Sequence, residues 1–211
     1  MDRRRFLHIA ALAVASAPLL AVAGPPAFAA PGAIDVEAIL NDPETPVAGN
    51  PAGDVTIVAF MDYSCPLCKK SSPDLEKFVD DDGKVRLVYK DWPILTSASV
   101  TGAHLALAAN YQGKYRQAHV AMMNIRGEKI DDASLREAVK GAGVDMALLD
   151  ADLKAHDADI SALLKRDMSE AESLGLEVPP VFLIGPFKVA KAIDYDEFKA
   201  TVADFRARIA K

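Results

Sequence analysis

The stretch Asp54-Val-Thr-Ile-Val-Ala-Phe-Met-Asp-Tyr-Ser-Cys-Pro-Leu-Cys-Lys-Lys-Ser-Ser-Pro73 decides the fold of this chain. It begins with a nearly continuous apolar run, Val55–Met61, whose length and β-branched content predict a buried central strand. After a polar break the chain enters a helix, because Pro66 suits the first helical position, where its missing N–H is not needed. We therefore expect Cys65 to be the N-cap residue and Cys68 the third residue of this helix.

The position of Cys65 predicts a reactive thiolate. A sulfur at the start of a helix faces the free N–H groups of the first turn and the positive end of the helix dipole, so its pKa should fall below the free value of about 8.5. Cys68 lies three residues further on the same face, close enough to form a disulfide. We expect Cys65 to be the exposed nucleophile that forms a mixed disulfide, and Cys68 to resolve it.

Two structural uses of the cysteine pair compete with redox chemistry. A disulfide between residues i and i+3 closes so small a loop that it stabilises the fold by only about 2 kcal/mol. A zinc site needs two more ligands of suitable spacing, and His104, His119 and His156 are scattered without a second pair. A redox-active dithiol is therefore favoured, and no metal site is predicted from these residues.

Residues 1–29 have the pattern of an export signal. Arg3-Arg4-Arg5 forms the basic region, an apolar stretch follows, and Ala27-Phe28-Ala29 is a cleavage site of the A-x-A type. The start also resembles a twin-arginine signal, with the general secretory route as the alternative. A membrane anchor is less suited, because Pro18 interrupts an apolar stretch that is already short for a bilayer. We expect cleavage and a periplasmic location.

The charge of the mature chain argues against two classes of partner. Removal of the signal takes away three arginines and one aspartate, which leaves 21 Lys and Arg against 29 Asp and Glu, a net charge of −8. Such a chain has no basic surface for nucleic acid or anionic lipid. Export also leads to an oxidising compartment, where a dithiol couple can act as a disulfide donor.

The remaining pattern predicts strands and helices in a mixed order. The cysteine helix should run past Pro73 and end near Gly83, followed by a second strand at residues 85–92. Helices are expected at residues 97–112, 114–125, 131–142, 145–154 and 157–174. A hairpin with strands at 180–184 and 187–192 and a final helix after Asp194 complete the chain. Residues 30–53 are predicted to be a lead-in segment with a short helix at 35–40 and several turns.

This order of elements resembles the thioredoxin fold with a helical insertion, as in the DsbA family of exported thiol–disulfide oxidoreductases. Four stretches carry the resemblance: Phe60–Cys68, Tyr89–Leu95, Ala108–Tyr115 and Pro179–Gly185. It implies an α/β fold, with a thioredoxin-like domain at residues 54–95 and 176–211 and an all-helical insertion at residues 96–175.

The resemblance also implies a substrate groove. In that family the proline two residues before the strand phenylalanine is cis and packs beside the cysteine pair, and here that residue is Pro180. The residue before it offers its backbone to an extended substrate peptide. Pro179 occupies this position and has no N–H, so we expect weaker peptide binding than in relatives with Thr or Val there. Pro66, Leu67 and Val181 complete the expected support of the active site.

Two further departures from the family concern the chemistry. Ala59 stands six residues before Cys65, where many relatives have a buried Glu or Asp that relays the proton of the second cysteine. Resolution should therefore be slower, unless Asp62, Lys90 or water substitutes. Leu67 offers no donor to the thiolate, so backbone amides should stabilise it. We expect a Cys65 pKa near ~5 and a potential between about −120 mV, as in DsbA, and about −180 mV, as in protein disulfide isomerase.

The sequence thus predicts a periplasmic, monomeric enzyme that introduces or exchanges disulfides in exported polypeptides with cysteines. Its only redox group is the Cys65–Cys68 couple, with no added cofactor, and a membrane or soluble redox partner reoxidises or reduces it. Oxidase is favoured over reductase or isomerase, because the lead-in segment is too short for a dimerisation module. The competing hypothesis is a binding module of the same fold that holds a soft metal such as Cu(I) through both cysteines.

Overall fold

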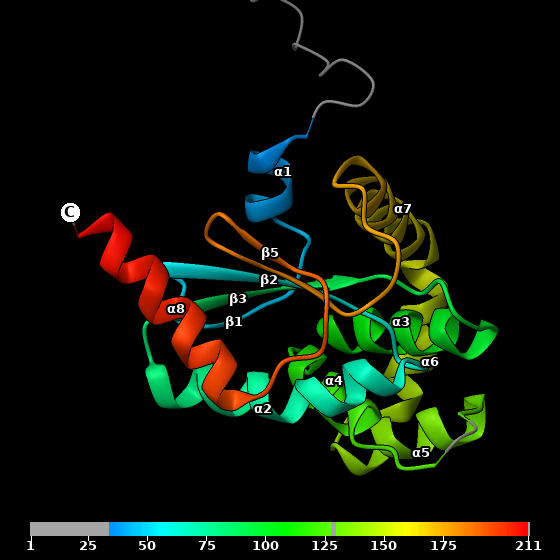
Figure 1. Cartoon of the computed structure of the whole chain (residues 1–211). Coiled ribbons are helices and arrows are strands. Elements are labelled where there is room, and N and C mark those ends of the chain that lie inside the picture. Colours follow the sequence, from blue (N-terminus) through cyan, green and yellow to red (C-terminus); the bar gives the residue numbers. More distant parts are fainter. Residues whose placement is uncertain (1–33, 128–129, 211) are drawn as a thin grey trace, which may run out of the picture. The chain divides into compact units, whose positions relative to one another are not determined.

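The computed structural model describes residues 34–127 and 130–210, so the predicted export signal lies outside the described residues. The centre is a mixed five-stranded sheet with the strand order β1-β3-β2-β4-β5 (Figure 1). Its strands are β1 Val47–Gly49, β2 Val55–Met61, β3 Val85–Asp91, β4 Val181–Ile184 and β5 Phe187–Val189. β2 runs parallel to β3, whereas the other neighbouring pairs are antiparallel.

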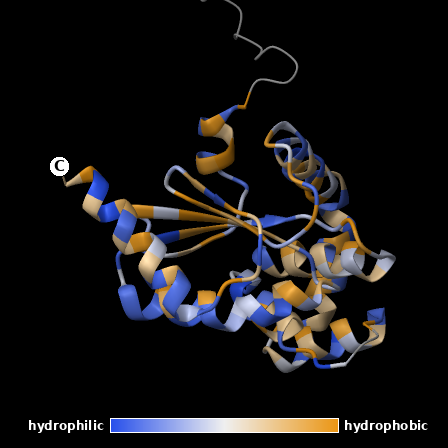
Figure 2. Ribbon diagram, viewed as in Figure 1, coloured by the Kyte–Doolittle hydropathy of each residue, from blue (hydrophilic) through white to orange (hydrophobic). Residues whose placement is uncertain are grey.

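The central strand β2 forms because nearly all of its residues are apolar and buried on both faces. Its residue Ala59 lies between Tyr89 of β3 and Phe182 of β4. Hydrophobic colour runs along the strands of the sheet, while much of the helix that follows β2 is hydrophilic (Figure 2). The two strands predicted for the start of the fold are confirmed, and β3 ends at Asp91, one residue before the predicted end.

The predicted helices are also confirmed. The cysteine helix, α2, spans Pro66–Asp82 without a break at Pro73, and Gly83 ends it in a left-handed conformation with φ 66°. The other helices in the described part of the chain are α1 Val36–Asn41, α3 Ser97–Asn110, α4 Tyr115–Met123, α5 Asp132–Gly141, α6 Met146–Ala155, α7 Asp157–Ser173 and α8 Tyr195–Ile209.

Helices cover both faces of the sheet, and the cysteine helix α2 lies on one defined face. Leu75 and Phe78 of α2 and Phe198 of α8 belong to the apolar cluster that includes one face of β2 and β3. Ile39 of α1 and Ala171 of α7 belong to the cluster on the opposite face. Helices α3 to α6 lie beyond one end of the sheet (Figure 1).

Strand β1 corrects the prediction that residues 30–53 contain only a short helix and turns. Val47–Gly49 pairs with β3 and forms one edge of the sheet. Gly49 is required at its end, because φ is +71° and an added Cβ would lie 2.3 Å from the carbonyl oxygen of Val85. Three residues are too few to produce an alternating pattern, so this strand has no signal in the sequence.

Candidate active site

The two cysteines lie where the sequence predicts them, at the start of α2. Cys65 is the N-cap residue with extended backbone angles, and Pro66 occupies the first helical turn. The backbone N–H of Cys68 donates to Sγ of Cys65 over 3.3 Å. The first turn therefore presents a hydrogen-bond donor to the sulfur of Cys65, as expected for an N-cap residue. Both cysteines are free thiols in this structure.

The surroundings of Cys65 favour its thiolate. A hydrogen bond from the Cys68 side chain lowers its pKa most, burial opposes this, and the backbone amides of Cys68 and Leu67 lower it further, to about 7. The direction agrees with the sequence, but the expected pKa near ~5 is too low. The prediction that backbone amides would stabilise the thiolate is also incomplete, because the Cys68 thiol has the largest effect.

Cys68 has the opposite character. It is fully buried, and burial, followed by the neighbouring Cys65, raises its pKa far above that of a free thiol. The two sulfurs therefore differ in the way that exchange chemistry requires: one ionises near neutral pH, and the other holds its proton until something accepts it.

The loop before β4 covers the reactive sulfur. The Pro179–Pro180 peptide bond is cis. The thiol of Cys65 donates to the carbonyl oxygen of Pro179 over 3.4 Å, and Val181 then begins β4 as a buried residue. Cys65 is consequently only 4% exposed. The prediction of an exposed nucleophile is wrong, because a loop distant in sequence lies on this sulfur.

Two apolar side chains that are close in sequence to the cysteines and to the proline pair are exposed to solvent. Leu67, between the cysteines, is 51% exposed, and Val178, just before the proline pair, is 64% exposed. Pro66 is exposed as well, whereas Pro179 and Pro180 are buried. Of the predicted supporting residues, Pro66 and Leu67 are thus exposed, whereas the two prolines and Val181 are buried.

Asp62 anchors the loop between β2 and α2. One carboxylate oxygen accepts hydrogen bonds from the N–H of Ser64 and the hydroxyl of Ser99, each over 2.7 Å. The other accepts from the N–H groups of Ile94 and Leu95 over 2.9 and 3.1 Å. Four donors occupy this buried carboxylate. Its position just after a predicted strand was the only sequence signal for this role.

Lys90 does not replace the acid that is missing at Ala59. Ala59 belongs to the apolar cluster on the cysteine side of the sheet. Lys90 is buried beside α7, where its Nζ lies 3.2 Å from Asp167 and 2.7 Å from Glu170. Since α7 covers the other face, Lys90 points away from the cysteines and is excluded as their proton carrier.

A second buried polar cluster lies beside the loop after β2 and was not predicted from the sequence. The hydroxyl of Tyr63 hydrogen-bonds to Nδ1 of His119 over 3.0 Å, and that of Tyr115 donates to Asp91 over 3.1 Å. Burial lowers the pKa of His119 to about 3 and raises that of Asp91 to about 7. His119 is thus a packed, neutral histidine, and the cluster joins α4 to the end of β3.

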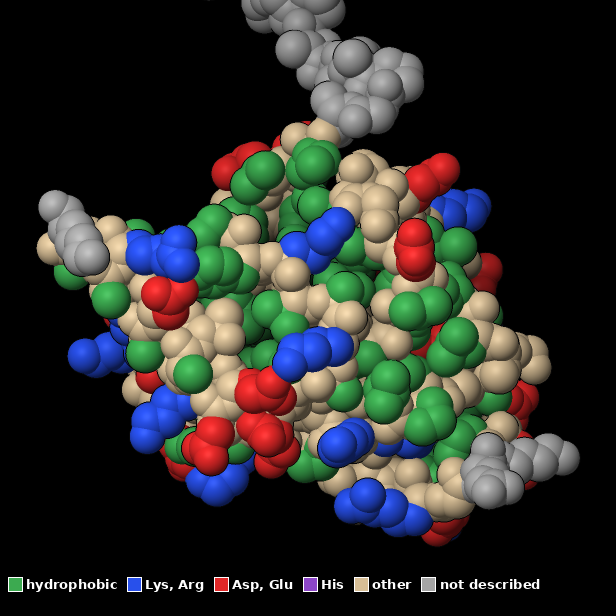
Figure 3. Space-filling view, viewed as in Figure 1, with side chains coloured by type: hydrophobic (Ala, Val, Ile, Leu, Met, Phe, Trp, Pro, Cys, Tyr) green, Lys and Arg blue, Asp and Glu red, His purple; other side chains and the backbone are tan. Residues whose placement is uncertain are grey.

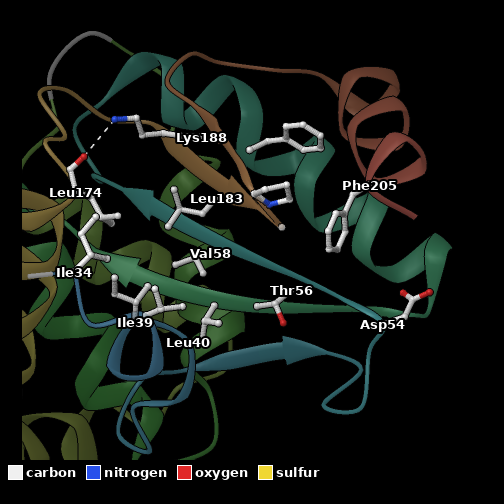
Figure 4. A pocket seen from close by; sticks show the side chains of 14 residues that line it. Ile34, Ile39, Leu40, Asp54, Thr56, Val58, Leu174, Leu183, Lys188 and Phe205 are labelled. Atoms are coloured by element: carbon white, nitrogen blue, oxygen red, sulfur yellow. Dashed lines mark hydrogen bonds between the residues drawn. The ribbon is translucent and has the colours of Figure 1, made fainter. Parts of the chain in front are cut away.

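A separate pocket lies on the opposite side of the sheet from the cysteines. It has a volume of about 560 Å³, and its lining includes Ile39, Val58, Leu183 and Phe205 (Figure 4). In the space-filling view, hydrophobic side chains are scattered over the face shown, with several of them near α1 at the top (Figure 3). Because Val58 faces away from the cysteines, this pocket is not part of the dithiol site.

Neither a metal site nor a membrane span is evident in the described ranges. Among residues 34–127 and 130–210, no three His, Cys, Asp or Glu side chains are placed together to hold a metal ion. Within the same ranges, no helix has both the length and the apolar character needed to cross a bilayer.

Several solved structures are similar to this chain, and three of them are described here. A thioredoxin-like oxidoreductase from Silicibacter pomeroyi DSS-3 is 35% identical, with a TM-score of 0.76 over 82% of this chain and 98% of that chain. The thiol-disulfide exchange protein alpha-DsbA2 from Wolbachia pipientis is 28% identical, with a TM-score of 0.75 over 80% of this chain and 91% of that chain. A periplasmic thioredoxin-like protein from Salmonella enterica serovar Typhimurium is 27% identical, with a TM-score of 0.68 over 80% and 93% of the two chains.

Comparison of the sequence with known proteins identifies a family, and it also finds longer relatives of which the chain matches only a part. Na(+)/H(+) antiporter NhaA 1 from Mycobacterium sp. (strain KMS) is 24% identical over 165 residues, which is 72% of this chain. The chain matches only 26% of the length of that antiporter. The family model described as Thioredoxin matches residues 41–204. Together with the cysteine pair at the start of α2 and the solved structures, this match shows that the chain belongs to the thioredoxin family as a DsbA-like member.

Proposed function

We propose that the protein is a thiol–disulfide oxidoreductase that introduces disulfides into exported polypeptides in the periplasm. The observation that carries the proposal is the inequality of the two sulfurs, since the pKa of Cys65 is lowered to about 7 and that of Cys68 is raised. A thiol with a pKa near the ambient pH is the most effective attacking group in exchange.

The proposed cycle uses the pair in both directions. In the oxidised protein, a client thiolate attacks Sγ of Cys65, the Cys65–Cys68 bond breaks, and Cys68 leaves with the electron pair and takes up a proton. A second client thiolate then attacks the client sulfur of the mixed disulfide and releases Cys65 as a thiolate. In recharging, Cys65 attacks a disulfide of the redox partner, and Cys68 displaces the partner thiolate to restore the bond.

Ionisation of Cys65 itself promotes access to the covered sulfur. The neutral thiol donates its proton to the Pro179 carbonyl, but a thiolate has no proton to donate and is repelled by that oxygen. Loss of the proton therefore weakens the contact that covers Sγ. A client backbone that approaches Pro179 then meets a carbonyl acceptor and no N–H donor, so recognition depends on apolar contacts such as those of exposed Leu67.

The direction and location rest on chemistry and on resemblance. A stabilised Cys65 thiolate favours the reduced protein, which makes the disulfide form an oxidant. The export pattern of residues 1–29 and the periplasmic relative from Salmonella enterica support a periplasmic location. In this proposal the dithiol needs no added cofactor, the protein acts as a monomer, and a membrane or soluble partner recharges it.

Trapping with the Cys68→Ala variant tests this function. Because Cys68 is then absent, mixed disulfides on Cys65 should persist and should release exported proteins on reduction, while a Cys65→Ala control should trap none. Oxidation of a reduced peptide should proceed faster than reduction of insulin. Absence of trapped proteins, with stoichiometric copper in anaerobically purified protein, would reverse the proposal in favour of the Cu(I)-binding module.

A further inference from the structure

A groove of about 700 Å³ lies between α7 and two loops, the one that follows β3 and the one that leads into β4. Trp92 and Leu176 of its lining belong to the apolar cluster on the α7 face of the sheet, which is the face opposite α2. The groove shares no lining residue with the pocket around Val58. We call it the Trp92 groove, and its lining also includes Ile94, Met168, Glu172 and Glu177.

The first wall of the Trp92 groove is fixed to the turn that carries the reactive sulfur. The N–H of Ile94 donates to the Asp62 carboxylate over 2.9 Å, and the same carboxylate accepts from the N–H of Ser64 over 2.7 Å. The hydroxyls of Thr96 and Ser64 also form a hydrogen bond over 2.7 Å. Since Ser64 directly precedes Cys65, the loop after β3 is held beside the start of α2.

The second wall reaches the same sulfur from the other side. Glu177 lies two residues before Pro179, whose carbonyl oxygen is 3.4 Å from Sγ of Cys65. An extended chain spans about 3.3–3.6 Å per residue, so about two residues lead from this sulfur to the groove. A residue that neighbours a client cysteine on Cys65 is therefore within reach of the groove.

The floor and rim of the Trp92 groove are apolar. Trp92 is only 5% exposed, and its ring packs edge-on against that of Phe60, with 6.3 Å between the ring centroids. Met168 and Ile94 at the rim are 45% and 40% exposed. Exposed apolar side chains gathered around a hollow are typical of sites that bind a partner, and flexible methionine suits partners of varied shape.

Helix α7 gives the groove an acidic end and a basic end. Lys165, Met168, Ser169 and Glu172 line it, and their spacing of three and four residues places them on one face of the helix. Lys165 and Glu172 are two turns apart, so about 10 Å separates their backbones. Glu172 lies at the end of α7 that leads to Glu177, and both carboxylates are exposed. Neither forms an ion pair with another residue of the ranges 34–127 and 130–210.

We propose that the Trp92 groove binds the residues of an exported client that flank its reacting cysteine. An apolar side chain of the client lies against Trp92 and Met168, and a basic side chain lies near Glu172 and Glu177. The client chain must lie at Cys65 in every cycle, so a groove that begins beside this sulfur meets that chain. This inference rests on the proposed exchange function and adds the kind of client sequence that it favours.

Oxidation of designed peptides by the oxidised protein tests the proposal. Three reduced two-cysteine peptides of equal length differ only around the first cysteine, which is flanked on each side by leucine and arginine, by leucine and glutamate, or by two serines. Acid quenching and mass spectrometry at pH 7 give the second-order rate constants. The rate of each peptide with hydroxyethyl disulfide corrects for the intrinsic reactivity of its thiol. Reduced glutathione is the reference thiol that lacks an apolar flanking side chain.

Burial of a leucine side chain in this open groove should make the leucine–arginine peptide react about tenfold faster than the serine peptide. The charge should favour the leucine–arginine over the leucine–glutamate peptide by about two- to fivefold.

Two exposed positions allow the groove to be changed without disturbing the core. Met168→Ser should slow the leucine–arginine peptide about fivefold and leave the rate with glutathione unchanged. Leu148→Ser is its matched control, because Leu148 is 47% exposed on α6 and lies outside the groove. Glu177→Lys should reverse the order of the arginine and glutamate peptides, whereas Glu137→Lys on α5, with the same change in net charge, should not.

Each result supports or contradicts a different proposal. If Met168→Ser and Glu177→Lys give the same peptide ratios as their control variants, the Trp92 groove does not bind the client and the inference is wrong. If the natural protein oxidises neither glutathione nor any of the peptides, the proposed exchange function fails instead.

Discussion

The Cys68→Ala substitution should raise the pKa of Cys65, because the Cys68 thiol makes the largest contribution to lowering it. A hydrogen bond to a charged group is worth about 1.5–3 kcal/mol, and each pKa unit corresponds to about 1.36 kcal/mol, so the loss amounts to about one to two units. The pKa should move from about 7 to between about 8 and 9. The remaining backbone donor at 3.3 Å keeps it from rising further.

The assay is a pH titration of thiolate absorbance in reduced protein, with the rate of alkylation by iodoacetamide as a second readout. At pH 7 the thiolate fraction of Cys65 should fall from about half to about a tenth or less. Cys68→Ser is the matched control, because its hydroxyl still donates and should hold the pKa near that of the natural protein. A Cys68→Ala protein that still titrates at about 7 would refute this reasoning and assign the effect to the helix backbone alone.

Equilibration with glutathione should give the Cys65–Cys68 couple a reduction potential of roughly −200 mV. The Cys65 pKa lies about two units above the expected ~5, which lowers the potential by about 50 mV from the middle of the range expected from sequence. A value near −120 mV would contradict this account. Pro179→Thr restores an N–H and should tighten binding of a cysteine-containing peptide by about 1 kcal/mol in calorimetry. Unchanged affinity and exchange rate would show that this hydrogen bond does not contribute to peptide binding. Burial raises the folded-state pKa of Asp91 to about 7, so its stabilising contribution is complete below its unfolded pKa of about 3.9 and is lost as the pH rises through 7. Asp91→Asn cannot ionise and should be more stable than the natural protein by about 1–3 kcal/mol at pH 8 but not at pH 4 in denaturant unfolding; equal pH dependence of the two proteins would show that this carboxyl does not titrate as described. Ala59→Glu should speed decay of the mixed disulfide about tenfold, and no change would mean that a proton acceptor at this position is not limiting.

The central features of the fold could be predicted because their causes are local. Val55–Met61 is a run of apolar and β-branched residues, which suits a strand buried on both faces. Pro66 fixes the start of α2, and Gly83 fixes its end through a positive φ. The placement of Cys65 at the N-cap follows from these neighbours alone, so the sequence predicted the nucleophile and the direction of its pKa shift.

The size of that shift could not be predicted, because it depends on tertiary packing. The hydrogen bond from the Cys68 thiol and the burial of Cys65 act against each other, and burial depends on a carbonyl 114 residues away, at Pro179. In the same way, the sequence suggested Lys90 as a substitute proton carrier, but this lysine is paired with Asp167 and Glu170 on the other face of the sheet.

The sequence by itself determined the order of strands and helices and the dithiol at a helix start, since residues that are neighbours along the chain specify each of these elements. The missing acid at Ala59 followed from the resemblance to the DsbA family. Only the tertiary structure decided that Cys65 is covered, that Asp62 is fully occupied by donors, and that α7 and two distant loops form the Trp92 groove. The physical reason is that hydrogen bonds and burial depend on distances in space. A local sequence pattern does not predict which segments far apart in the chain will come into contact.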